Sequence, residues 1–180
     1  MATEEVPGTF LVSKEIEFDA GHRVPDHNGK CANPHGHRYR IRLSVIGGLQ
    51  AEGSRTGMVL DFAEIKQILQ DVHDAYDHGF VYRRGDLLVE DWVQKSPHLR
   101  WIPVGFSPTA ENFARFIYEY CRERFVEMHL PGVVAKVEVW ETPTSKAVYP
   151  VVATLVFDPH PGGSPMPGVP ATAQIRGGLL

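Results

Sequence analysis

The sequence predicts an α+β fold for this chain on three observations. Residues 9–22 and 35–48 alternate apolar and polar side chains with a period of two, which is typical of half-buried strands. Two amphipathic helical segments then follow one another, and two more strand-like segments, 133–141 and 146–157, come last. In the resulting order, ββααββ, antiparallel hairpins flank consecutive helices, which is typical of an α+β subunit with both helices on one face of the sheet.

The first two strands place histidines on their apolar faces. A Gly-, Pro- and Asn-rich segment, 24–34, separates these strands and favours a hairpin. One parity of the first strand contains Phe10, Val12, Ile16, Phe18, Ala20 and His22. One parity of the second contains His35, His37, Tyr39, Ile41, Leu43 and Val45. Because alternate residues of a strand share a face, each of these sets points to one side of the sheet.

The two helices are predicted from their first turns. Asp61 is a good N-cap residue, and Glu64 follows it at the spacing of a capping box. Ser107 or Thr109 caps the second helix, and Pro131 follows its end. Residues 79–108, which lie between the helices, receive no assignment, although two tryptophans indicate that they pack against the domain. Four strands and two helices leave one sheet face and the sheet edges uncovered, which favours a homo-oligomer.

Composition defines one domain and excludes several classes of function. Ten of the 23 residues from 158 to 180 are Pro or Gly, so we expect a disordered tail, a flexible N-terminus over 1–8 and a folded domain over 9–157. The net charge of −4 offers no basic field for nucleic acid or for an acidic membrane surface. No apolar run has the length of a membrane span, and the acidic N-terminus does not resemble a signal peptide. Two cysteines fit a reducing compartment, and we expect a cytoplasmic protein.

A metal site is predicted where the first hairpin closes. His35 and His37 project to one face, and His22 ends the preceding strand with the parity of its apolar side. Three neutral imidazoles suit Zn²⁺ and leave a fourth coordination position open, as in catalytic sites. Cys31 lies between the two strands, and its spacing leaves three roles open: a fourth ligand, a nucleophile or base beside the metal, or a small packing residue.

Two further groups can carry proton transfer or binding. Asp77 and His78 follow the first helix, and a carboxylate can orient an imidazole that moves protons. Adjacent residues on a regular helix do not face each other, so we do not expect this pair to bond directly, and a helix-end cap is the alternative. Glu141 has the parity of apolar neighbours, where a carboxylate is costly unless it is paired, for example with an amidine-like N–C–NH₂ edge. A solvated strand end is its alternative.

Together these segments resemble the family of 6-pyruvoyl-tetrahydropterin synthases and 6-carboxytetrahydropterin synthases. The matching segments are FDAGHRVPDHNGKCANPHGHRY, GMVLDF, YDH, PTAEN and ETPTSKAVY, in the family order over roughly residues 16–149. The resemblance implies a tunnelling fold, in which ββααββ subunits join their sheets into a barrel, as a hexamer or another assembly with sites between subunits. The spacing C-x-x-x-H-G-H resembles the bacterial carboxy branch, of the queuosine and 7-deazapurine pathway. Tyr76 and Ser107 depart from the usual residues, and residues 79–108 are long for the compact bacterial enzymes, which leaves the side-chain specificity open.

The same resemblance implies roles for particular residues. It implies His22, His35 and His37 as zinc ligands, Cys31 as the catalytic base, and Asp77 with His78 as a proton relay from a neighbouring subunit. It also implies that Glu141 anchors the pterin ring and that Thr109 helps to line its pocket. The implied reaction converts 7,8-dihydroneopterin triphosphate to 6-carboxy-5,6,7,8-tetrahydropterin, with release of acetaldehyde and triphosphate.

Three other functions remain as alternatives. The pyruvoyl branch of the same family eliminates triphosphate without releasing acetaldehyde. A cupin-like metal oxygenase also uses an H-x-H strand, but it expects a Glu a few residues later, and none lies between Arg38 and Val45. A non-catalytic zinc- or pterin-binding module would leave the cysteine and the Asp77–His78 pair without a purpose.

Overall fold

The computed structural model describes residues 8–151, and within them the predicted α+β tunnelling fold is confirmed. Its elements in chain order are β1 (Thr9–His22), the short 3₁₀ helix η1 (Lys30–Ala32), β2 (His35–Gly48), α1 (Phe62–Tyr76), β3 (Phe80–Arg83), α2 (Leu87–Lys95), β4 (Trp101–Val104), α3 (Ala110–Glu127), β5 (Val133–Thr142) and β6 (Ser145–Tyr149). The strands form one sheet in the order β4-β3-β1-β2-β5-β6. The predicted last strand, 146–157, is observed as β6 and ends at Tyr149, because Pro150 and Val151 are not in a strand. Residues 152–157, the segment 1–7 and the tail 158–180 lie outside the described residues.

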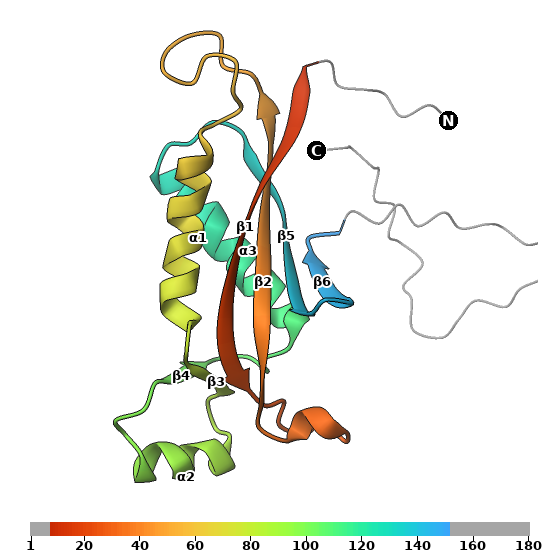
Figure 1. Ribbon diagram of the computed structural model, residues 1–180, viewed down its shortest axis with the longest axis vertical. Coiled ribbons are helices and arrows are strands. Elements are labelled where there is room, and N and C mark those ends of the chain that lie inside the picture. Colours follow the sequence, from red (N-terminus) through yellow and green to blue (C-terminus); the bar gives the residue numbers. More distant parts are fainter. Residues whose placement is uncertain (1–7, 152–180) are drawn as a thin grey trace, which may run out of the picture. The chain divides into compact units, whose positions relative to one another are not determined.

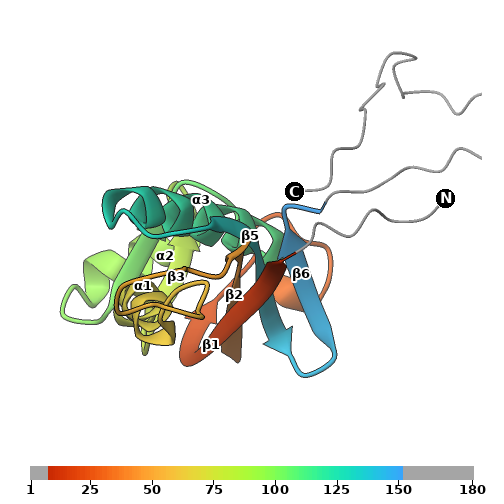
Figure 2. The same cartoon turned by 90° about the horizontal axis from the view of Figure 1, so that it is seen from above.

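The β1–β2 hairpin is the longest pairing and sets the position of the histidines. The two strands pair antiparallel from Thr9↔Gly48 to His22↔His35 without a register shift. Side chains therefore alternate between the two faces without a slip. One face packs on the helices, and towards the closed end the other carries charged cross-strand pairs such as Asp19–Arg38. Figures 1 and 2 show α1 and α3 on the same side of this sheet.

The core lies between that sheet face and helices α1 and α3. Its fully buried side chains come from β2, α1, α3 and β5 and include Tyr39, Ile41, Leu43, Ile65, Ile68, Leu69, Phe113, Ile117, Val137 and Val139. The predicted capping box of α1 is present, because Asp61 accepts from the Ala63 amide and Glu64 accepts from the Asp61 amide. Among the described helices, none is both long and apolar enough to cross a membrane.

The segment between the two predicted helices differs from the expected wholly antiparallel ββααββ order. It contains the strand–helix–strand unit β3-α2-β4, in which β3 pairs parallel to β1 and β4 pairs parallel to β3. These strands are only four residues long, too short for period-two alternation to identify them in the sequence. Trp92 and Trp101 pack against Phe80 with ring centroids 6.3 and 5.8 Å apart, which confirms that the segment packs. The addition extends the sheet at the edge beside β1 (Figure 1).

Candidate active site

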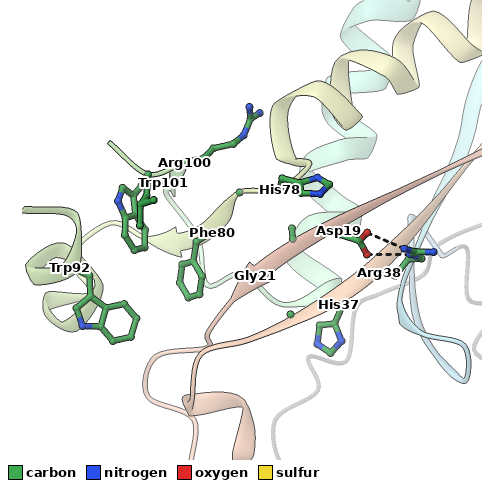
Figure 3. Close-up of a pocket in the computed structure, with 13 residues that line it drawn as sticks. Asp19, Gly21, His37, Arg38, His78, Phe80, Trp92, Arg100 and Trp101 are labelled. Carbon is green, nitrogen blue, oxygen red and sulfur yellow. Dashed lines mark hydrogen bonds and ion pairs between the residues drawn. The ribbon is translucent and has the colours of Figure 1, made fainter. Parts of the chain in front are cut away.

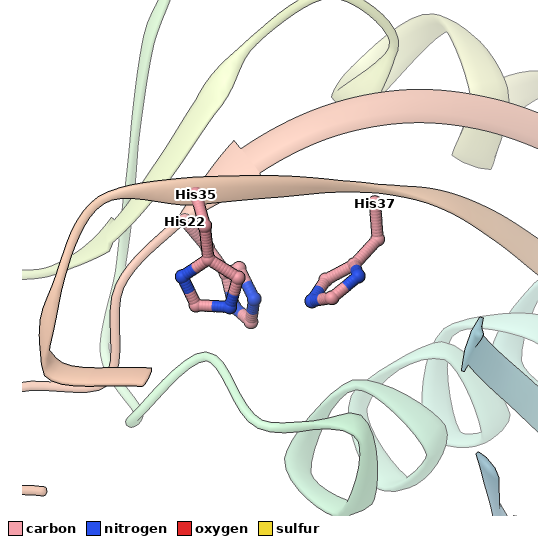
Figure 4. A group of neighbouring side chains, drawn as sticks. All are labelled: His22, His35 and His37. Carbon is pink, nitrogen blue, oxygen red and sulfur yellow. The ribbon is translucent and has the colours of Figure 1, made fainter. Parts of the chain in front are cut away.

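Three imidazoles meet where the β1–β2 hairpin closes. His22 and His35 are direct cross-strand partners, and His37 lies opposite Ala20, two residues further along the same face. One ligand nitrogen from each ring lies within 4.8 Å of the other two, so the group can hold a metal ion (Figure 4). Cys31 is not a member of this group, although its segment separates the two strands.

Backbone carbonyls orient two of the three rings. His22 Nδ1 lies 2.6 Å from the Pro108 carbonyl oxygen, and His35 Nδ1 lies 2.8 Å from that of Asn33. Because a carbonyl oxygen only accepts, each Nδ1 carries the proton and each Nε2 keeps its lone pair. His22 Nε2 is buried, and no group in the described part of the chain forms a hydrogen bond with it. A buried acceptor of this kind is costly unless something binds it, and this observation supports a cation between the rings.

The surroundings keep two of these imidazoles neutral. Burial lowers the pKa of His22 to about 4, and the charges of His35 and His37 add to the decrease, although the Pro108 hydrogen bond opposes it. Burial also lowers the pKa of His37, with a smaller contribution from His35. Neutral imidazole is the form that binds a metal ion, so both rings are in this form at neutral pH.

A cavity of about 330 Å³ brings together predicted residues from four segments. His22, Cys31, Thr109 and Glu141 all line it. Cys31 is exposed in η1, whereas Cys121 is buried in α3, where burial raises the pKa of its thiol to about 12. The structure thus brings an accessible thiol and a carboxylate into the cavity that includes one of the three histidines.

Glu141 is a half-buried carboxylate for which the described residues supply no hydrogen bond. Its side chain is 24% exposed, and its Oε1 lies 4.0 Å from His22 Nε2. Burial raises the pKa of Glu141, the charge of Glu111 raises it further, and His35 opposes the increase. The alternative prediction for Glu141, a solvated residue at a strand end, therefore does not describe it well. A ligand that donates hydrogen bonds would compensate the cost of burying this carboxylate.

Thr109 and Pro108 show what the start of α3 contributes to the site. Thr109 is the N-cap of α3, and its Oγ1 accepts from the Asn112 amide at 3.4 Å, so the hydroxyl has a structural role besides its place on the cavity wall. Pro108, one residue earlier, supplies the carbonyl that orients His22. No sequence signal identifies a backbone carbonyl as a partner of a distant ring, and the role of Pro108 was therefore missed.

Asp77 and His78 form a direct pair, contrary to the expectation from a regular helix. His78 Nδ1 lies 2.7 Å from Asp77 Oδ2, while Asp77 Oδ1 accepts from the Asp19 amide at 3.1 Å. The expectation was wrong because α1 ends at Tyr76 and His78 adopts a left-handed conformation with φ of 54°, so helix geometry does not apply. The hydrogen bond from His78 lowers the pKa of Asp77, and the Asp19 amide and the charges of His78 and His73 act in the same direction.

This pair does not share the cavity of Cys31 within one chain. His78 lines a separate cavity of about 660 Å³, together with His37, Phe80, Trp92, Arg100 and Trp101 (Figure 3). Asp19, whose amide donates to Asp77, belongs to the charged face of the β1–β2 hairpin. The three histidines share the opposite face with Ala20. One subunit therefore presents the thiol and the Asp77–His78 pair in two different places.

Comparisons with known proteins agree with this geometry. The family model described as 6-pyruvoyl tetrahydropterin synthase matches residues 11–151. The chain is 35% identical over 144 residues to a 6-carboxy-5,6,7,8-tetrahydropterin synthase of Haemophilus influenzae, covering 78% of this chain and 98% of that protein. An Aquifex aeolicus protein of the same name is 35% identical over 158 residues, covering 77% and 96%. The Caenorhabditis elegans 6-pyruvoyl tetrahydropterin synthase structure superposes with a TM-score of 0.56 at 25% identity, covering 78% and 94%.

Proposed function

The chain belongs to the 6-pyruvoyl tetrahydropterin synthase family, and on that premise we propose that it is a 6-carboxy-5,6,7,8-tetrahydropterin synthase. Its substrates would be 7,8-dihydroneopterin triphosphate and one water, and its products 6-carboxytetrahydropterin, acetaldehyde and triphosphate, as in queuosine biosynthesis. The observation that carries the proposal is the meeting of three imidazoles beside a cavity with an accessible thiol and a half-buried carboxylate. This set matches the needs of a carbon–carbon lyase that binds a pterin.

Zinc is the metal that we assign to His22, His35 and His37. The fit rests on the donor set, which is three imidazoles with no carboxylate or thiolate among them, and on the unpartnered buried His22 Nε2. When bound, zinc would act as a Lewis acid that polarises a substrate oxygen. The carbonyls of Pro108 and Asn33 hold two of the rings in the tautomer that such a site requires.

Glu141 would anchor the pterin ring. The pyrimidine edge of a pterin presents an N–H and an NH₂ group side by side, and one carboxylate can accept from both. These two hydrogen bonds would offset the cost of burying Glu141, which accepts no hydrogen bond from residues 8–151. Thr109 would complete the wall of the same pocket.

Proton transfer would involve Cys31 and the Asp77–His78 pair. Cys31 Sγ, exposed on the cavity wall, would take a proton from the substrate side chain. His78 would transfer protons on the other side through Nε2, because its Nδ1 faces Asp77. Asp77 would hold the imidazole in that tautomer, as a carboxylate does for a catalytic histidine.

We further assign the complete site to an interface between copies of this chain, in a barrel-forming homo-oligomer such as a hexamer. The support is that Cys31 and His78 line different cavities within one chain. A second copy would have to present its Asp77–His78 pair to the Cys31 cavity of the first. A catalytic domain over 9–157 and a cytoplasmic location complete the proposal; both described cysteines are free, as in a reducing compartment.

Product analysis tests the proposed function. Purified, zinc-loaded protein is incubated with 7,8-dihydroneopterin triphosphate, the pterin product is identified by mass, and acetaldehyde is assayed. We expect the 6-carboxy product with stoichiometric acetaldehyde. A 6-pyruvoyl product without acetaldehyde would assign the chain to the other branch of its family, and absence of any product would leave only a binding module.

Replacing Glu141 by alanine should weaken pterin binding by about 100-fold, because two charge-assisted hydrogen bonds to a half-buried carboxylate are lost. Isothermal titration with an unreactive pterin measures this affinity, and the zinc content should stay at the wild-type value. Glu119→Ala is the matched control, since that carboxylate lies on α3, is 44% exposed and pairs with Arg122 at 3.3 Å. An unchanged affinity in Glu141→Ala would remove the assignment.

A further inference from the structure

The segment that contains Cys31 is tied to the added β3-α2-β4 unit by one buried ion pair. Arg23, one residue after β1, donates from Nη1 to Asp86 Oδ1 at 2.8 Å and from Nε to the Ala32 carbonyl at 2.8 Å. The two side chains of the ion pair are only 14% and 4% exposed. The guanidinium therefore joins the residue after Cys31 to the start of α2.

Asp86 occupies an N-cap position but does not cap its helix. Its side chain makes no capping hydrogen bond. Glu90 accepts instead from the Gly85 amide at 2.7 Å, at the same end of α2. An N-cap aspartate normally binds the free amides of its own helix, and here the carboxylate faces Arg23. The arrangement uses a buried carboxylate to hold a guanidinium in place.

Two adjacent residues, Arg23 and Val24, hold the backbone around Cys31 by hydrogen bonds. The Val24 amide donates to the Cys31 carbonyl at 2.8 Å, and Arg23 Nε binds the next carbonyl, that of Ala32. The guanidinium of Arg23 is rigid and planar. When Asp86 binds its Nη1, the direction of its Nε–H towards the Ala32 carbonyl is therefore also fixed. The position of the Cys31 thiol in its cavity therefore depends on Asp86, which lies 55 residues away in the chain.

We propose that Arg23 and Asp86 are positioning residues that place Cys31 for proton abstraction, an inference that rests on the proposed function. The added β3-α2-β4 unit thereby supports the active site through Asp86. Neither residue lines the cavity that holds Glu141 and Thr109, so the link acts on the thiol and not on the pterin.

Three variants test the link in the full-length, zinc-loaded protein. Asp86→Ala removes the acceptor, whereas Asp86→Asn removes the charge but keeps an amide oxygen that can accept from Arg23. Asp26→Asn is the matched control, because Asp26 also joins the Cys31 segment to the added unit, through Arg83 at 2.8 Å, but this ion pair is exposed.

We expect Asp86→Ala to lower kcat by about 10- to 100-fold, because a displacement of about 1 Å at a reacting group has an effect of that order. KM should stay within about twofold and the zinc content should not change. Amide hydrogen exchange at residues 30–33 should accelerate about tenfold or more, since the carbonyl contact that orders them is lost. Asp86→Asn should recover part of both effects, and Asp26→Asn should match the wild type.

Two results would overturn the inference. One is a wild-type kcat together with wild-type exchange in Asp86→Ala. The other is a fall in kcat that only follows lost zinc or an unfolded fraction seen by circular dichroism. If Asp86→Ala does not fold, the same criteria apply to Asp86→Asn, with an expected loss of about 3- to 10-fold. A wild-type protein without product would refute the proposed function, while exchange at residues 30–33 would still decide whether the link orders this segment.

Discussion

Cys31→Ala is expected to lower kcat for 7,8-dihydroneopterin triphosphate by about 10²–10⁴-fold, the usual contribution of a positioned general base. Cys31 is an accessible thiol on the cavity that holds His22 and Glu141, and it lies outside the group of three histidines. The variant should therefore bind zinc and pterin as the wild type does. Single-turnover product formation, zinc content by atomic emission and titration with an unreactive pterin check these statements in one preparation.

Cys121→Ala is the matched control for this experiment. Cys121 is fully buried in α3, so its removal should cost some stability but leave turnover of the folded protein unchanged. Loss of zinc together with activity in Cys31→Ala would make Cys31 a metal ligand and the site a closed one. Retention of full activity would show that another group removes the proton.

The second large effect is expected from His35→Ala, which should weaken zinc binding by more than about 100-fold. Mutating a residue that only orients a metal ligand typically lowers metal affinity by about 10- to 100-fold, and loss of a ligand itself should lower it more. Only two imidazoles would remain of the group whose nitrogens lie within 4.8 Å of one another. Competition with a chromogenic chelator measures the affinity, and activity at limiting zinc should fall in parallel.

His98→Ala controls for the loss of an arbitrary imidazole, because His98 is exposed in the turn between α2 and β4. It should bind zinc with the wild-type affinity and stoichiometry. If His35→Ala also kept that affinity, the three-histidine group would not be the zinc site, and the proposed lyase would lose its basis.

The strand pattern made much of the candidate site predictable. Period-two alternation in β1 and β2 assigns His22, His35 and His37 to one face, because the direction of a side chain in a strand follows from local backbone geometry. Once the two strands form a hairpin, these residues must meet near its closed end, and the register His22↔His35 brings them there. The apolar parity of Glu141 predicted a half-buried carboxylate in the same way.

The segment between the predicted helices was not predictable by these means. β3 and β4 have four residues each, fewer than a periodicity needs, and they pair in parallel with partners set by the tertiary fold. The direct bond between Asp77 and His78 was missed for a related reason. It depends on where α1 ends and on a positive φ at His78, and the apolar spacing of the helix predicts neither.

Taken alone, the sequence determined which side chains share a face and the residue types available for a metal and a pterin, because these depend on neighbours within a few positions. The tertiary structure alone decided that the Pro108 carbonyl orients His22, that Asp86 holds Arg23 beside Cys31, and that His78 lines another cavity. The first two contacts join residues that are 86 and 63 positions apart, and the third places His78 away from the cavity that Cys31 lines. Local backbone preferences carry no information about such distances; the packing of the whole domain does.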